Sequence, residues 1–296
     1  MRARSMSLLF VSCLSALLPA LVFAEGERGR DPIEAVPKGT SSTKVVFIAG
    51  SNFFKLGEHE YREGCSVLMD LVRQSKDGIA TTLALDWPEK DETLRGADAV
   101  VLFFDGAAKH ALLDGKHRQQ FQQLVDQGAG VVALHQGVDL PAELHEAGRE
   151  WFGAVWEKGY SQRAHWVHKY EMFPEHPVTR GVTPFSIDDG YLFRLRFVPD
   201  LKGVTPILRT VSPTKPVKIQ DGSEDIVGWT YDRPKGGRTF AFTGGHLHRS
   251  LAEEGYRRLL TNGILWAAKA NVPAGGAPVA LDPASLELPA PKPAAK

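Results

Sequence analysis

The first half of the chain alternates short apolar runs with amphipathic stretches. Apolar residues dominate four segments, namely 44–50, 79–85, 99–104 and 130–134. A nearly continuous apolar run of this length is typical of a parallel strand that is covered on both faces. Between these runs, residues 58–75 and 116–127 carry apolar side chains at helical spacing. The alternation predicts a doubly wound α/β sheet made mainly of parallel strands.

The second half of the chain has a less regular pattern. Short runs of β-type residues are separated by Pro and Gly turns, at 163–170, 185–187, 203–208, 226–231 and 239–244. These runs predict a β-rich insertion whose last strands return to the main sheet. Residues 251–270 predict a closing helix, because their large apolar side chains recur at helical spacing.

Both ends of the chain differ in composition from the region between them. Arg2 and Arg4 precede an apolar stretch, and Val22 and Ala24 supply small side chains for a cleavage site, which predicts a secretory signal peptide over residues 1–24. The protein is therefore expected to be exported, to the periplasm or the extracellular space. An uncleaved membrane anchor is the alternative, but the apolar run is shorter than the ~20 residues that span a bilayer. We expect a flexible lead-in over 25–43, a folded domain over 44–270 and a disordered Ala/Pro-rich tail over 271–296.

Composition narrows the class of ligand. The formal net charge is zero and the basic residues are dispersed, which argues against nucleic acid as a partner. No glycine-rich phosphate loop follows a predicted strand, so no nucleotide cofactor is indicated. Cys65 is the only cysteine after the predicted signal peptide, and its place within a predicted helix favours a buried, inert thiol. A small neutral or polar molecule is the expected ligand, and no stable membrane span is expected in the mature chain.

Polar side chains follow two of the predicted parallel strands, at the edge where open α/β sheets bind ligands. His135-Gln136-Gly137 follows the fourth strand, and a polar residue at such a tight turn is typical of a displayed catalytic side chain. Glu58 and His59 follow the first strand, where a helix is predicted to begin. A carboxylate there can simply complement the helix dipole, whereas a neutral histidine there can serve as a ligand or base. We take His59 and His135 as candidate catalytic residues, and Glu58 and Gln136 as candidate substrate-binding residues.

The strand predicted over 239–244 ends in a third histidine-bearing segment, Gly244-Gly245-His246-Leu247-His248. If the chain stays extended, His246 and His248 point to the same side. Two imidazoles on one side suit either a divalent metal such as Zn²⁺ or an acid/base pair. The predicted catalytic and metal-binding set is therefore His59, His135, His246 and His248.

The predicted insertion supplies three further candidates. Strand alternation puts His165 and Trp166 on opposite faces, and an aromatic ring near the site would suit stacking on a sugar, although Trp more often packs in a core. Asp189 lies in an Asp-Asp-Gly segment, for which an ordinary solvated turn is the simpler interpretation. His165, Trp166 and Asp189 are kept as candidate substrate-binding residues.

Taken together, these segments resemble the ThuA-like (trehalose utilisation) family. The resemblance runs from Lys44 to about Pro273 and is carried by residues 44–50, 57–60, 134–137, 165–166, 176–181, 243–248 and 262–268. It implies a flavodoxin-like fold related to class I glutamine amidotransferases, and a link to disaccharide or keto-sugar metabolism. Amidotransferases place a cysteine at the turn that here reads His135-Gln136-Gly137, so the chain is not expected to be a glutamine amidotransferase. Relatives often carry further histidines within 52–54 and in place of Tyr61, which this chain lacks.

The leading hypothesis is an exported, sugar-processing enzyme, a hydrolase, lyase or isomerase, that uses its histidines with a divalent metal or as acid and base. A non-catalytic carbohydrate-binding or accessory protein on the same scaffold is the alternative. The sequence does not separate a self-sufficient enzyme from one that works with a partner oxidoreductase or as a homo-oligomer.

Overall fold

The computed structural model describes residues 31–35, 43–51, 54–76, 78–211 and 224–288. The predicted signal peptide, residues 1–24, and the end of the predicted tail, residues 289–296, lie outside the described residues. The strands are β1 (Thr43–Ala49), β2 (Ile79–Leu85), β3 (Ala99–Phe103), β4 (Gly130–Leu134), β5 (Ala154–Val155), β6 (Gln162–Tyr170), β7 (Phe185–Phe193), β8 (Arg196–Phe197), β9 (Val204–Thr210), β10 (Asp225–Asp232) and β11 (Arg238–Phe242). The α-helices are α1 (Tyr61–Arg73), α2 (Asp91–Leu94), α3 (Gly115–Asp126), α4 (His145–Phe152) and α5 (Glu254–Ala267).

The main sheet confirms the predicted mainly parallel α/β architecture. Its strand order is β2-β1-β3-β4-β11-β10-β9. The neighbours from β2 to β11 pair in parallel, whereas β10 pairs antiparallel with both β11 and β9. The carboxyl ends of β1, β3, β4 and β11 therefore lie along one edge of the sheet, where ligands bind in such folds.

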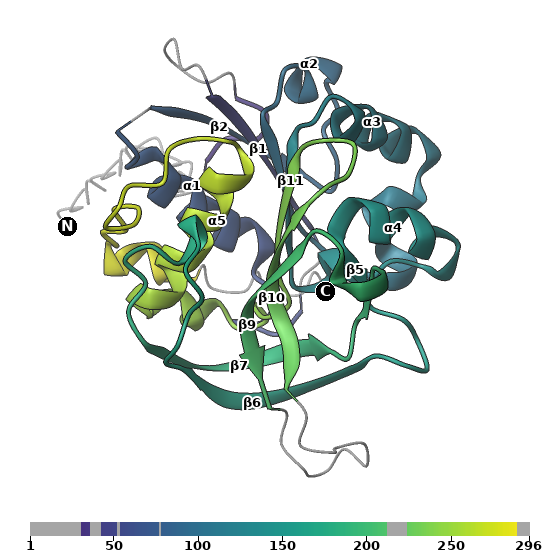
Figure 1. Ribbon diagram of the computed structural model, residues 1–296. Coiled ribbons are helices and arrows are strands. Elements are labelled where there is room, and N and C mark those ends of the chain that lie inside the picture. The colour runs from purple at the N-terminus through teal and green to yellow at the C-terminus, as the bar shows by residue number, and fades with distance from the viewer. Residues whose placement is uncertain (1–30, 36–42, 52–53, 77, 212–223, 289–296) are drawn as a thin grey trace, which may run out of the picture. The chain divides into compact units, whose positions relative to one another are not determined.

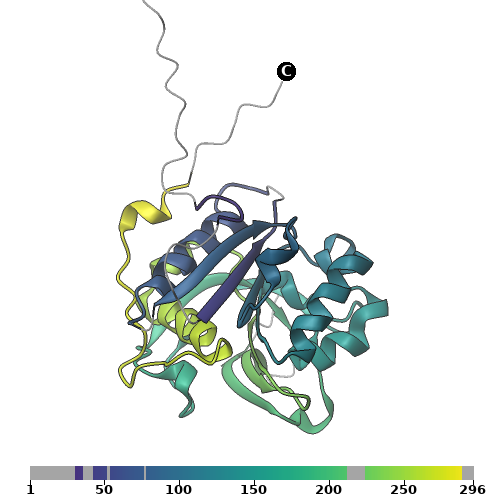
Figure 2. The ribbon, with the colours of Figure 1, turned by 90° about the horizontal axis from the view of Figure 1, so that it is seen from above.

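Helices cover both faces of this sheet (Figures 1 and 2). α1 and α5 lie on one face, and α2, α3 and α4 lie on the other. Successive side chains of β1 enter different cores: Val45 and Phe47 pack on the α1/α5 side, and Val46 and Ile48 on the opposite side. Because both faces are buried, the strand needs apolar residues at every position, which explains the continuous apolar runs in the sequence.

The predicted β-rich insertion is present as two small antiparallel pairs, β6 with β7 and β5 with β8. The β6–β7 hairpin is the longer pair, and it crosses near the lower ends of β9 and β10 in Figure 1. β7 also contacts the short 3₁₀ helix η3 (His135–Val138) that follows β4. The hairpin thereby reaches the edge of the sheet where the candidate residues lie.

Two predicted helices have different boundaries in the structure. The helix predicted over 58–75 begins only at Tyr61, because Glu58 pairs instead with Leu247 in an isolated antiparallel bridge. The helix predicted over 251–270 is a 3₁₀ helix, η7 (His248–Ala252), followed by α5. Among the described helices, none is long and apolar enough to cross a membrane.

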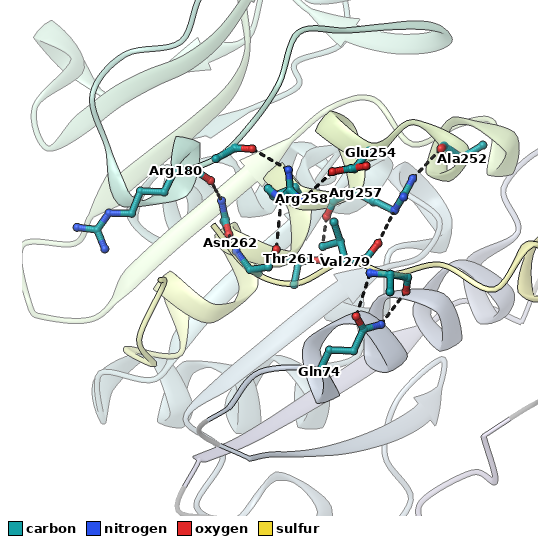
Figure 3. A network of polar contacts seen from close by, with 12 residues as sticks. Gln74, Arg180, Ala252, Glu254, Arg257, Arg258, Thr261, Asn262 and Val279 are labelled. Atoms are coloured by element: carbon teal, nitrogen blue, oxygen red, sulfur yellow. Dashed lines mark hydrogen bonds and ion pairs between the residues drawn. The ribbon is translucent and has the colours of Figure 1, made fainter. Parts of the chain in front are cut away.

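The prediction of a disordered tail is wrong for residues 271–288, which pack against α5 and α1 (Figure 3). Val272, Ala277 and Val279 are buried. Asn262 on α5 accepts a hydrogen bond from the Ala277 amide, and Arg257 donates to the Val279 carbonyl. The Ala/Pro-rich composition hid this packing, because backbone groups of the segment make its polar contacts.

Part of the predicted flexible lead-in is also held in place. Ile33 bridges to Leu83 on the edge strand β2. The Glu34 carboxylate accepts hydrogen bonds from the Thr93 hydroxyl and from the amide of Glu89. Residues 31–35 therefore extend the folded unit beyond its predicted start at Lys44.

Candidate functional site

Three histidines from distant parts of the chain meet at one point. His59 Nε2 lies 3.0 Å from His135 Nε2 and 2.9 Å from His246 Nδ1. One ring nitrogen from each residue lies within 4.8 Å of the other two, and all three side chains are buried. We call His59, His135 and His246 the histidine cluster.

Each histidine of the cluster sits in a sharply turned segment beside a strand end. His135 comes directly after β4 with a φ of +51°, and His59 precedes α1 with a φ of +54°. His246 follows Gly245, whose φ is +100°. A positive φ is strained for residues other than glycine, and such strain concentrates at functional sites. A tight turn, as expected, follows the fourth strand at His135.

Backbone contacts join the loops that carry His59 and His246. The His59 amide donates to the His246 carbonyl at 2.9 Å, and the His248 amide donates to the Gly57 carbonyl at 3.0 Å. The cluster is therefore built on two loops that pair like short antiparallel strands.

Asp189 positions the loop that carries His246 by accepting hydrogen bonds from its backbone. Its carboxylate is fully buried on β7, where one oxygen accepts from the Gly245 amide at 2.7 Å and the other from the Leu247 amide at 3.0 Å. Burial raises the pKa of Asp189 to about 6, against the lowering effect of these amides. Neither the predicted substrate contact nor the solvated turn describes Asp189, because its acceptor positions are occupied by backbone N–H groups.

A hydrogen bond at His135 and a nearby carboxylate at His246 indicate which nitrogens face the centre of the cluster. His135 Nδ1 lies 3.0 Å from the Thr243 carbonyl oxygen, which can only accept, so Nδ1 carries the proton and Nε2 presents its lone pair. Glu58 Oε2 lies 3.7 Å from His246 Nε2, which favours a proton on that nitrogen and a lone pair on Nδ1. These outer contacts are of the kind that orient imidazoles as metal ligands.

Electrostatics keeps the cluster neutral. Burial lowers the pKa of His59 and of His246 to about 4, and it lowers the pKa of His135 well below its ordinary value. The neighbouring imidazoles act in the same direction, because a second positive charge nearby is unfavourable. Neutral imidazoles are the form that binds a metal ion.

His248 does not belong to the cluster, although the sequence predicted that it would. His248 is the first residue of η7, and it is not among the histidines whose ring nitrogens converge. His248 is buried beside Leu251 and Tyr256 instead, in a cavity of about 20 Å³. Neither ring nitrogen has a hydrogen-bond partner among the described residues.

The other predicted residues divide between the rim of the cluster and the core. The exposed His165 ring lies 4.4 Å from the His246 ring, edge to face. Gln136 accepts a hydrogen bond from the Gly106 amide and so ties two strand-end turns together. Trp166 is buried against Tyr191 and donates to the Thr210 hydroxyl, so it packs in the core and does not flank a ligand.

Arg163 and Asp139 form a pair near the cluster that the sequence patterns did not predict. Arg163 on β6 donates to the Asp139 carboxylate at 3.0 Å, and its guanidinium stacks on Trp156 at 4.4 Å from the ring centroid. Arg163 stands two residues before His165 on the same face of a strand, which is a signal that alternation could have supplied. The backbone carbonyl of Thr243, by contrast, left no signal in the sequence.

Comparison with known proteins agrees with this architecture. Residues 44–267 match the ThuA family model, described as trehalose utilisation. The chain is similar in structure to a putative ThuA-like protein from Parabacteroides merdae, with a TM-score of 0.53 and 18% identity over 76% of this chain and 90% of that one. A putative ThuA-like protein from Bacteroides uniformis has a TM-score of 0.53 and 15% identity, over 79% of this chain and 95% of that one.

A weaker likeness links the chain to PurLQS from Thermotoga maritima, with a TM-score of 0.45 and 10% identity over 76% of this chain and 98% of that one. No curated protein sequence matches the chain significantly. The family match covers most of the described sheet and contains all three histidines of the cluster. The chain therefore belongs to the ThuA family, the trehalose utilisation family.

Proposed function

We propose that the protein is an enzyme of carbohydrate metabolism that uses a divalent metal ion held by His59, His135 and His246. The observation that carries the proposal is the convergence of three buried ring nitrogens within 4.8 Å of one another. Family membership supports a sugar-related substrate, since the family is described by trehalose utilisation.

The chemistry of the three side chains fits a metal ion such as Zn²⁺. In tetrahedral zinc sites with Zn–N distances of ~2.0–2.1 Å, neighbouring nitrogens stand about 3.3 Å apart. The two short contacts in the cluster are 2.9 and 3.0 Å, so a small outward shift of each ring would admit an ion. Three imidazoles leave a position for substrate or water, as in catalytic zinc sites.

The remaining residues have defined places around this centre. A bound divalent ion would supply Lewis acidity toward an oxygen of the substrate. Glu58 would hold the outer nitrogen of His246, and the Thr243 carbonyl would hold that of His135. His165 lies at the rim, where its exposed imidazole is placed to contact a substrate or to carry a proton.

Metal analysis tests this proposal directly. We expect elemental analysis to find one divalent ion per folded chain. A chelator should remove this ion and lower the melting temperature, and added Zn²⁺ should restore it. His135→Ala and His246→Ala should lose the ion, whereas the matched variant His145→Ala should keep it, since His145 binds the Leu140 carbonyl outside the cluster. A wild-type protein that takes up no divalent ion, and whose melting temperature does not respond to Zn²⁺, would refute the proposal.

Sugar turnover separates an enzyme from a binding protein on the same scaffold. For an enzyme, His135→Ala should abolish turnover of a disaccharide or keto-sugar while binding is retained. For a carbohydrate-binding or accessory protein, the wild-type chain should bind the sugar without turnover. Adding an oxidoreductase would test for a required partner.

We also propose export through residues 1–24, which predicts a mature protein that begins at Glu25.

A further inference from the structure

We propose that Arg163 binds an anionic group of the substrate, a carboxylate or a phosphate, beside the histidine cluster. The proposal rests on the proposed function, because it assumes that the cluster is where the substrate reacts. The Arg163 proposal adds to the proposed function the chemical class of the substrate, a sugar derivative that carries an oxyanion.

The first observation is the placement of Arg163. It stands on β6 two residues before His165, so both side chains project from the same face of the hairpin. His165 contacts the ring of His246, and Arg163 reaches Asp139, the residue directly after η3, the 3₁₀ helix that begins at His135. The guanidinium thus lies between the hairpin and the loop that carries one histidine of the cluster.

The second observation is that Arg163 is held rigidly and still presents donors. Asp139 is 1% exposed, and it receives a hydrogen bond from one guanidinium nitrogen, Nη2. Trp156 supports one side of the guanidinium plane. The Arg163 side chain nevertheless remains 47% exposed. The Nη2 contact engages one of the five N–H donors of a guanidinium, which leaves other donors of this half-exposed side chain for a ligand.

The third observation concerns charge. Lys55 and Glu58, which precede His59 in the same loop, pair with each other at 3.1 Å. A preorganised guanidinium is the side chain best suited to two parallel hydrogen bonds with a planar carboxylate or a phosphate. Because its conformation is already restricted by Asp139 and Trp156, Arg163 would lose little side-chain entropy when it binds such a group.

Binding measurements with three probes test this assignment on the metal-loaded protein. Glucuronate supplies a carboxylate, glucose 6-phosphate supplies a phosphate, and glucose is the neutral reference. A charge-assisted hydrogen bond contributes ~1.5–3 kcal/mol, so we expect an anionic probe to bind about tenfold to a hundredfold more tightly than glucose. Whichever anionic probe binds more tightly relative to glucose shows whether the site prefers a carboxylate or a phosphate.

Three variants assign the gain to Arg163. Arg163→Gln should remove the preference for the anionic probe, and Arg163→Lys should retain part of it. Arg196→Ala is the matched control, because Arg196 also stacks on an aromatic ring, that of Tyr160, and pairs with a carboxylate, that of Glu157. The control should bind all three probes as the wild type does.

The design keeps loss of fold apart from loss of binding. Arg163→Gln leaves Asp139 buried without its partner, so the double variant Arg163→Gln/Asp139→Asn is measured as well, with melting temperature as the check. Equal affinity of the wild type for all three probes, or an anion preference that survives in the folded double variant, overturns the assignment. Metal content is measured on the same samples, so a failure of the metal centre is seen separately from a failure of anion binding.

Discussion

Buried residues outside the histidine cluster set its geometry through contacts with the backbone. Asp189 is the main example, since its carboxylate receives backbone amides on both sides of His246. Its neighbour Asp188 is exposed and pairs with Arg249, so the two adjacent carboxylates have unrelated roles. These two contacts restrict the backbone on either side of His246 and thereby the position of its side chain.

Asp189→Asn is expected to weaken the site and the fold together. An amide side chain would turn its own N–H donors toward one of the backbone N–H groups that the carboxylate accepts, at a cost of about 1–3 kcal/mol. We expect a lower melting temperature and a zinc affinity reduced ~10–100-fold, measured by titration of the metal-free protein. Asp188→Asn is the control that should leave both unchanged. Equal behaviour of the two variants would contradict the positioning role.

A buried histidine outside the cluster makes stability depend on pH. Burial lowers the pKa of His110 to about 4, and its neutral ring accepts from the Leu112 amide and donates to the Gly137 carbonyl. An unfolded histidine has a pKa of ~6.5, so between these values the unfolded chain binds more protons than the folded chain. The contribution of His110 to stability is therefore intact above pH ~6.5 and is lost as the pH falls toward 4.

Denaturant titrations with chelator at pH 7 and pH 5 test this dependence. The wild type should lose about 1–2 kcal/mol more between the two pH values than His110→Asn, in which the titrating ring is gone. The other buried histidines contribute to both proteins, so they cancel in the difference. Parallel losses in the two proteins would show that His110 is not responsible.

At the scale of elements, close contact between α5 and the sheet sets the position of the strand that leads to His246. Gly263 on α5 faces Phe240 on β11, and a Cβ atom built at Gly263 would lie 2.3 Å from Phe240 Cδ1. Phe240 is fully buried, so its ring has no room to retreat. The absence of a side chain at Gly263 lets the helix lie directly on the strand.

Gly263→Ala is expected to destabilise the protein although alanine favours helices. In an exposed helix the change would stabilise by ~0.5–1 kcal/mol, but here overpacking should cost about 1–3 kcal/mol. Gly115→Ala at the start of α3 is the matched control, because the nearest atom to its Cβ would be 4.0 Å away. Urea unfolding should show a lower free energy of unfolding for Gly263→Ala and no decrease for Gly115→Ala. A gain in both would mean that helix propensity outweighs the contact.

At the scale of the whole molecule, the segment 271–288 completes the core on the α1/α5 side. Asn262 links it to the loop near Arg180, and Gln74, directly after α1, exchanges two hydrogen bonds with the backbone of Ala280 (Figure 3). The segment therefore joins elements that are distant in the sequence.

Removal of this segment should lower the stability of the entire fold. Burial of Val272 and Val279 alone corresponds to about 3 kcal/mol. A chain that ends at Ala270 should lose at least that much free energy of unfolding in a denaturant titration. A chain that ends at Leu288 retains every described contact and should match the full chain. Equal stability of the chain ending at Ala270 would contradict the packing role.

Much of the fold was predictable because a strand that is buried on both faces needs a continuous run of apolar residues. The apolar runs of β1, β3 and β4 and the strand-end histidines His135 and His246 are read from nearest neighbours in the sequence. The fourth predicted ligand, His248, failed because the chain enters a 3₁₀ helix at that residue, and strand alternation does not predict where an extended segment ends.

The α/β architecture, the family and the sheet edge that carries the histidines could be predicted from local periodicity and from motifs in order along the chain. The folded structure excluded His248 from the predicted set, and it showed that Asp189 supports a loop and that residues 271–288 are packed. The physical reason is that each of these depends on contacts between segments far apart in the chain, such as residue 59 with residue 246. Local patterns record burial, whereas the identity of the partner is set only when the chain is folded.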